Sequence, residues 1–120
     1  MLDIIVKRFD EPDEVREFPK GKFEVVTVGG MTIGRASYNP GWIWSEDVGA
    51  AIGKTSCDVE HLVLVVSGCA TAEMDDGHVI EMKPGDLVYV APGHNSRVVG
   101  DEPYVSLHFQ GATAYAAAKS

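Results

Sequence analysis

Residues 60–93 have the sequence EHLVLVVSGCATAEMDDGHVIEMKPGDLVYVAPG, in which short apolar runs alternate with turn-forming residues. The first run, residues 60–67, is nearly continuous in aliphatic and β-branched side chains, which are typical of strands. Asp75-Asp76-Gly77 predicts a hairpin, because Asp-Gly tolerates the positive φ that such turns require. A further turn signal at 83–86 precedes a short apolar strand at 87–91. The stretch therefore predicts several short strands joined by tight turns.

The flanking sequence continues this rhythm in both directions. Short strands with frequent turn signals are typical of a β-sandwich or β-barrel. Helical signal is confined to the ends, where residues 11–18 predict a helical turn and residues 112–119 a marginal helix. Residues 45–56 are the one long segment without periodicity, and in compact domains such segments are often functional. The remaining predicted strands are 23–28, 31–38, 70–74, 78–82 and 104–109.

Composition bounds the class of protein. The chain has 120 residues, 45% of them hydrophobic and 23% charged, which fits a globular domain and excludes a disordered chain. We treat residues 1–120 as one domain, with 1–20 as an N-terminal arm and 112–120 as a C-terminal tail. Ten Lys and Arg against 18 Asp and Glu give a net charge of −8, so nucleic acid and membrane are not expected partners. No apolar run would cross a bilayer and no secretory signal pattern is found, so we expect a cytoplasmic protein.

The two cysteines, Cys57 and Cys69, are expected to be free thiols. If Ser67-Gly68 forms a tight turn, Cys69 faces Val66 across a hairpin, and Cys57 lies farther along the strands. At roughly 3.3 Å per strand pair, about three pairs separate the sulfurs, which is beyond the reach of a disulfide. A reducing compartment is consistent with this pattern.

Two stretches resemble the motifs of the cupin superfamily. In the first, His61 is followed by six residues and then Gly68, which is the spacing of the first cupin motif with His in place of its usual Glu. In the second, Gly85 is followed by five residues and Ala91-Pro92-Gly93, which matches the second motif except for the Ala. The resemblance implies an all-β fold, the double-stranded β-helix or jelly-roll barrel of the cupins.

The resemblance also implies a metal site, although the sequence departs from the usual ligands. Cupins commonly use His-any-His and Glu from the first motif and a His from the second. Here the first three positions fall on Thr55, Cys57 and His61, whereas a longer loop would place the first at Asp47. His94 lies two residues before the usual second-motif His. A set drawn from Asp47, Cys57, His61 and His94 would suit one divalent ion per chain, namely zinc, iron, nickel or manganese.

Each of these residues also has an ordinary structural interpretation. His61 lies among aliphatic residues and would serve as a hydrogen-bonded core residue, while His94 would serve as an exposed turn residue. Cys57 is consistent with a small buried apolar side chain. Asp47 and Glu46, our candidate general base, lie in the aperiodic segment, where solvated acids are common.

Three further side chains are candidates for ligand binding. Trp42 and Trp44 lie two residues apart on one face of an extended segment, where they would line a pocket or else cover the core or a dimer interface. His108 alternates with Tyr104 and Ser106 on one face of the last predicted strand. Periodicity alone leaves both orientations of that face open, and we prefer the one in which His108 faces solvent.

Three functions are consistent with these features. The resemblance implies a small cupin that holds a metal and binds a small organic ligand; as an enzyme it would be a dioxygenase, isomerase, epimerase or cyclase. The second is a metal-free barrel that binds a small ligand as a sensor or store. The third is a structural module that supports a homodimer, since open sheet edges need covering. The motifs of serine hydrolases, phosphate-binding loops and zinc ribbons are missing from the sequence. We therefore expect a small-molecule partner and a homodimer, and leave catalysis open.

Overall fold

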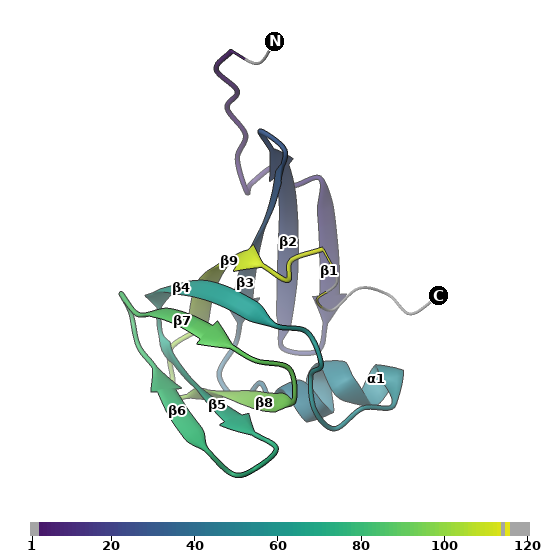
Figure 1. Cartoon of the computed structure of the whole chain (residues 1–120), viewed down its shortest axis with the longest axis vertical. Helices are drawn as coiled ribbons and strands as arrows, with labels where there is room; N and C mark the ends of the chain where they lie inside the picture. Colours follow the sequence, from purple (N-terminus) through teal and green to yellow (C-terminus); the bar gives the residue numbers. More distant parts are fainter. Residues whose placement is uncertain (1–2, 114, 116–120) are drawn as a thin grey trace.

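The computed structural model describes residues 3–113 and 115, and in this part of the chain nine strands form two antiparallel sheets (Figure 1). One sheet has the strand order β1-β2-β3-β9-β4-β7, and the other has the order β6-β5-β8. The strands are β1 (Glu14–Phe18), β2 (Gly21–Val28), β3 (Met31–Tyr38), β4 (His61–Ser67), β5 (Cys69–Met74), β6 (Val79–Met82), β7 (Leu87–Val90), β8 (His94–Val99) and β9 (Tyr104–Gln110).

The predicted all-β fold is confirmed, and most strands lie where the sequence placed them. The Asp75-Asp76-Gly77 turn joins β5 to β6, and Gly77 has a φ of 94°, as the turn chemistry requires. Along β4, His61, Val63 and Val65 are buried, while the alternate residues are more exposed. This alternation directs one face of the larger sheet toward the smaller sheet, and the core forms between them.

Residues 11–18 contain a strand instead of the predicted helical turn. Strand β1 pairs with β2 in antiparallel register, from Glu14 opposite Val25 to Phe18 opposite Gly21. This pairing lies within the expected N-terminal arm, and the hydrogen bonds to β2 override a weak local helical preference. At the other end, the predicted helix at 112–119 falls largely outside the described residues, and residues 111–113 form a turn.

The chain does not form the predicted hairpin across Ser67-Gly68. Strand β4 pairs with β7 and β9, whereas β5 pairs with β6 and β8, so the chain passes between the two sheets at Gly68. The crossing requires glycine, because the φ there is 73° and a Cβ would collide with the carbonyl oxygen of Pro103. Cys57 and Cys69 are nevertheless free thiols, as predicted.

The aperiodic segment contains two short helices, which the sequence did not predict. A π-helix, Ser45–Gly49, runs directly into α1 (Ala50–Ile52), and the left-handed Gly53 ends the pair (Figure 1). Gly49 allows Trp44 to pack closely, since a Cβ at Gly49 would lie 2.6 Å from Trp44 Cζ3. The helices thus fix an aromatic side chain at the barrel.

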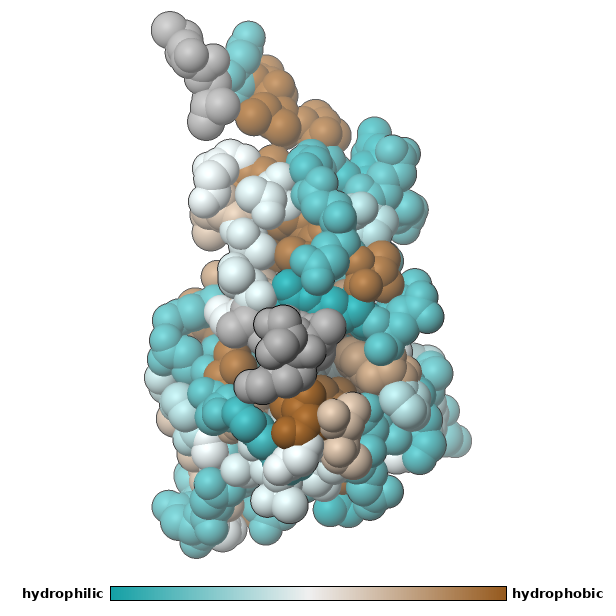
Figure 2. All heavy atoms as spheres, turned by 90° about the vertical axis from the view of Figure 1, so that its right-hand side faces the viewer, coloured by the Kyte–Doolittle hydropathy of each residue, from teal (hydrophilic) through white to brown (hydrophobic). Residues whose placement is uncertain are grey.

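The molecule has a buried core and a protruding N-terminal segment. Ile4, Ile5 and Val6 are exposed on this segment, which extends from the body at the top of Figure 2. In the part of the chain that the structure describes, no helix is long and apolar enough to cross a membrane. The buried polar and charged residues are Glu24, Asp47, His61, His94, Ser106 and His108.

Candidate functional site

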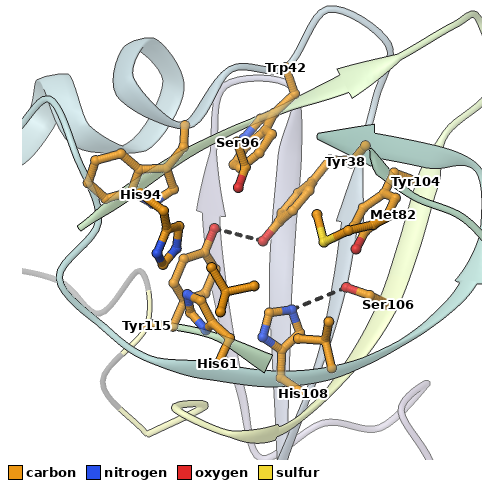
Figure 3. A pocket seen from close by; sticks show the side chains of 14 residues that line it. Tyr38, Trp42, His61, Met82, His94, Ser96, Tyr104, Ser106, His108 and Tyr115 are labelled. Atoms are coloured by element: carbon orange, nitrogen blue, oxygen red, sulfur yellow. Dashed lines mark hydrogen bonds between the residues drawn. The ribbon is translucent and has the colours of Figure 1, made fainter. Parts of the chain in front are cut away.

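A cavity between the two sheets has a volume of about 40 Å³ (Figure 3). A single water needs about 10–15 Å³ on this scale, so the cavity has room for only a few atoms. None of the described residues that line it is Asp, Glu, Lys or Arg. The lining residues are Tyr38, Trp42, Trp44, His61, Val63, Ala70, Met82, Val90, His94, Ser96, Tyr104, Ser106, His108 and Tyr115.

Three buried residues form what we call the Cys/His cluster: Cys57, His61 and His94. The two histidines line the cavity, and Cys57 lies against His61. Each offers one donor atom, and the three atoms lie within 4.8 Å of one another. The Cys57 Sγ is 3.6 Å from the His61 Nε2, and the two imidazole rings are 5.1 Å apart between centroids. Figure 3 shows His61 and His94 side by side, with Tyr115 next to His61. Three convergent donors of this kind match the protein ligands of a zinc site.

The backbone explains how residues distant in sequence come together here. The amide of Cys57 donates to the carbonyl of His94 at 2.6 Å, and the amide of Gly93 donates to the carbonyl of Cys57 at 2.8 Å. His61 begins β4 and pairs with Val90 at the end of β7. The turn between β7 and β8 therefore carries His94 beside both partners.

A backbone hydrogen bond fixes the tautomer of His94. Its Nδ1 is 2.7 Å from the carbonyl oxygen of Ala91. A carbonyl oxygen only accepts, so Nδ1 carries the proton and the lone pair is on Nε2. A hydrogen bond of this type commonly orients a histidine that ligates a metal.

Burial keeps the Cys/His cluster uncharged. It lowers the pKa of His61 to about 3, with a smaller contribution from His94, and burial also lowers the pKa of His94. Burial raises the pKa of the Cys57 thiol to about 11. Near pH 7 the histidines are thus neutral, which is the state that binds metal, and a divalent cation would displace the thiol proton.

Part of the cavity wall is aromatic. The Tyr38 ring stacks on Trp42 with centroids 3.8 Å apart and planes within 8°, and it also lies 5.9 Å from Tyr104. Trp42 and Trp44, which we call the indole pair, are 1% and 4% exposed. Neither indole Nε1 has a hydrogen-bond partner among the described residues. The indole pair therefore has unpaired N–H donors, whereas the Cys/His cluster offers lone pairs, although His61 Nδ1 is also buried without a partner among the described residues.

Solved structures share this architecture at low sequence identity. A cupin 2 domain-containing protein from Halorhodospira halophila is 24% identical, with a TM-score of 0.54 over 73% of this chain and 61% of its own. The chain has the cupin fold. An ectoine synthase from P. lautus is 12% identical, with a TM-score of 0.62 over 89% of this chain and 78% of its own. A Lactobacillus farciminis oxalate decarboxylase, in complex with formate, is 17% identical, with a TM-score of 0.57 over 82% of this chain and only 30% of its own. No protein-family model and no curated protein matches the sequence.

His108 faces the interior of the cupin barrel, so the preferred solvent-facing orientation was wrong. The face that carries Tyr104, Ser106 and His108 is buried, because β9 lies between β3 and β4 in the larger sheet and this face packs toward the smaller sheet. His108 Nε2 is 3.1 Å from Ser106 Oγ, and the ring centroid lies 5.1 Å from that of His61. Its Nδ1 has no partner among the described residues, and burial holds its pKa well below the usual value. His108 is thus a third neutral imidazole beside the Cys/His cluster.

Neither acid of the aperiodic segment lines the cupin cavity. Asp47 is buried, but its carboxylate accepts a hydrogen bond from the amide of Ile43 at 2.8 Å and lies 4.0 Å from the ammonium of Lys20. Glu46 is exposed. The structure therefore separates the proposed fourth ligand and the proposed base from the other candidates.

Sequence reasoning missed Tyr115, which closes the cavity beside the Cys/His cluster. Its ring centroid lies 4.8 Å from that of His61, and its hydroxyl is 2.7 Å from the hydroxyl of Tyr38. The Arg16 guanidinium holds this segment by donating to the carbonyl oxygens of Ala112, Thr113 and Tyr115 at 2.8, 3.0 and 2.6 Å. No local signal in the alanine-rich C-terminal sequence indicates this role.

Proposed function

We propose that this cupin binds one divalent cation, preferentially zinc, at Cys57, His61 and His94, and binds a small organic ligand beside it. The observation that carries the proposal is the convergence of three buried donor atoms within 4.8 Å, two of them on histidines that line the cavity. A thiolate and two imidazoles suit zinc, and three protein ligands leave a fourth position for water or substrate. The ectoine synthase and the oxalate decarboxylase support a catalytic role, because both are enzymes built on the same fold.

The chemistry of the lining favours Lewis-acid assistance. Bound zinc would polarise a carbonyl group or lower the pKa of a coordinated water. No carboxylate occurs among the described lining residues, and burial lowers the pKa of His61 and His108, which makes both weak bases at neutral pH. The side chains of the barrel would therefore bind, orient and desolvate the ligand. Isomerase, epimerase or cyclase chemistry fits such a site, whereas a dioxygenase would need iron in place of zinc.

A metal-free barrel that binds a small ligand is the second candidate. The aromatic walls and the uncharged lining favour it, because both suit a small, partly apolar molecule without any cation. It would show little metal together with a melting temperature that rises on adding a ligand.

Elemental analysis of protein purified without chelator separates the two candidates. We expect about one equivalent of zinc in the wild type and little in His61→Ala, His94→Ala and Cys57→Ser. The matched controls are His78→Ala and Cys69→Ser, since His78 is exposed and Cys69 lies outside the cluster. Both controls should retain the metal. If the wild type neither contains nor takes up zinc, the metal-free candidate replaces the first.

A further inference from the structure

Each member of the indole pair holds a buried N–H donor without an acceptor. Trp42 and Trp44 are 1% and 4% exposed, and within residues 3–113 and 115 neither Nε1 has a partner. Such donors are rare in native proteins, because the hydrogen bond that the N–H loses to water on burial is not replaced. Two of them in one small cavity indicate that a ligand supplies the acceptor.

Both indoles line the cavity. The Cε3–Cζ3 edge of Trp44 packs on Gly49, where a Cβ would lie 2.6 Å from Cζ3 and 3.1 Å from Cε3. Nε1 lies on the opposite edge of the indole, away from Gly49, and Trp44 lines the cavity. One face of Trp42 is covered by Tyr38 at 3.8 Å, and Figure 3 shows its ring beside Ser96 at the cavity wall.

Hydrogen bonds to β8 fix the segment that carries the indole pair. The amide of Val98 donates to the carbonyl of Trp42 at 3.0 Å. The amide of Ser45 donates to Asn95 Oδ1 at 3.0 Å, and Asn95 Nδ2 donates to Ser45 Oγ at 3.1 Å. The same strand begins with a histidine of the Cys/His cluster. The two donors are therefore held in place before any ligand arrives, which reduces the entropy lost on binding.

Charge determines the class of ligand, and this step rests on the proposed function. Imidazoles bind a divalent cation as neutral ligands, and cysteine binds it as a thiolate. A cation at the Cys/His cluster would carry a net charge of about +1 with its protein ligands. No described lining residue is a carboxylate that would balance that charge. Because an unbalanced buried charge is unfavourable, a monoanion fits better than a neutral molecule or a dianion.

We infer that the cavity binds a small monocarboxylate whose oxygen atoms accept hydrogen bonds from the Nε1–H groups of Trp42 and Trp44. The cavity is small, about 40 Å³, which favours a small molecule. The positive charge favours a monoanion over a neutral analogue of the same shape, because the neutral molecule would leave that charge unbalanced.

Nuclear magnetic resonance of the zinc-loaded wild type tests this inference directly. The chain contains two tryptophans, so the ¹H–¹⁵N spectrum contains two indole signals, which Trp42→Phe and Trp44→Phe assign. Acetate is the probe and acetamide is the matched neutral control. We expect both indole protons to move downfield and saturate with acetate, and to respond at least about tenfold more weakly to acetamide.

The outcomes distinguish a failure of this inference from a failure of the proposed function. If zinc binds and acetate leaves either indole signal in place, or acetamide moves both equally, the inference fails while the metal site stands. If zinc does not bind, the charge argument and the proposed function fail together. Each Trp→Phe variant should weaken acetate binding about tenfold while retaining zinc. The wild-type shifts decide the question even if a variant folds poorly.

Discussion

The Cys/His cluster and the indole pair differ in hydrogen-bonding character. At the Cys/His cluster, the Nδ1–H of His94 donates to the Ala91 carbonyl and leaves the Nε2 lone pair available. The indole pair has N–H groups that no described residue accepts. Lone pairs suit a cation, and N–H donors suit an anion or a neutral acceptor. The comparison teaches that the cavity is arranged for two unlike occupants side by side.

The two groups also differ in what holds them. The C-terminal segment covers the Cys/His cluster, and Arg16 from β1 fixes it by bonds to three carbonyl oxygens. The indole pair is fixed by neighbouring bonds to β8. Strand β8 also begins with His94, so each substitution at one group is paired with a control at the other.

Replacing Gly111 by alanine should cause the largest loss of stability, beside the Cys/His cluster. Gly111 has a φ of 90°, and a Cβ there would collide with the Glu60 carbonyl oxygen and lie 3.2 Å from His61 Nδ1. We expect the free energy of unfolding in urea to fall by about 3 kcal/mol. Gly77→Ala is the control, since it has a φ of 94° but open space around the Cβ, and should cost about 1 kcal/mol. Equal losses of stability in the two variants would show that the collision with the Glu60 carbonyl oxygen does not cause the effect.

Zinc should stabilise the wild type through the Cys/His cluster alone. At a free concentration of one hundred times Kd, binding contributes about 2.7 kcal/mol, or about 10 °C in melting temperature for a domain of this size. His94→Ala should abolish the shift in differential scanning fluorimetry. Trp44→Phe should retain it, because the indole pair contributes no donor atom to the cluster. A shift of equal size in His94→Ala would place the zinc elsewhere.

Acid should destabilise the metal-free protein, again through the histidines. Burial lowers the pKa of His61 to about 3 and lowers the pKa of His94 and His108, whereas an unfolded histidine titrates near 6.5. The unfolded chain therefore binds more protons below that pH, and stability is complete above it and falls as the pH decreases toward the folded-state values. His61 alone accounts for a loss of about 2 kcal/mol at pH 5.

Urea unfolding at pH 7 and pH 5 measures this effect. The exposed His78 provides the control, because His78→Ala should leave the difference unchanged. A free energy of unfolding that stays constant between the two pH values would show that the histidines are not buried as neutral groups.

The substitution Arg16→Lys should have the smallest of the four predicted effects on stability. A lysine retains the charge but lacks the planar fork that reaches three carbonyl oxygens. We expect a loss of about 1–2 kcal/mol in thermal unfolding. Arg97→Lys, at an exposed position, should change stability by less than about 0.5 kcal/mol. Equal losses at the two positions would contradict a specific role for the three hydrogen bonds of Arg16.

The predictability of the site differs from residue to residue. His61 and His94 were accessible because both lie at fixed spacings from turn glycines, and turn chemistry is local. His108 was assigned to the wrong face, since a period of two defines two faces and says nothing about which one another sheet will cover. Tyr115 had no signal at all, because its position depends on Arg16, 99 residues earlier.

The sequence by itself predicted seven of the nine described strands and the β5–β6 hairpin, because alternation and Asp-Gly turn chemistry act over a few residues. The cupin fold followed from the resemblance of its two motifs. The sequence also marked the histidines that belong to the motifs. The tertiary structure alone decided that Cys57 lies beside His94, through a backbone pairing 37 residues apart. Packing between the sheets likewise decided which buried groups share the cavity. Such contacts depend on the whole topology, since residues far apart in the chain meet only when both sheets have formed.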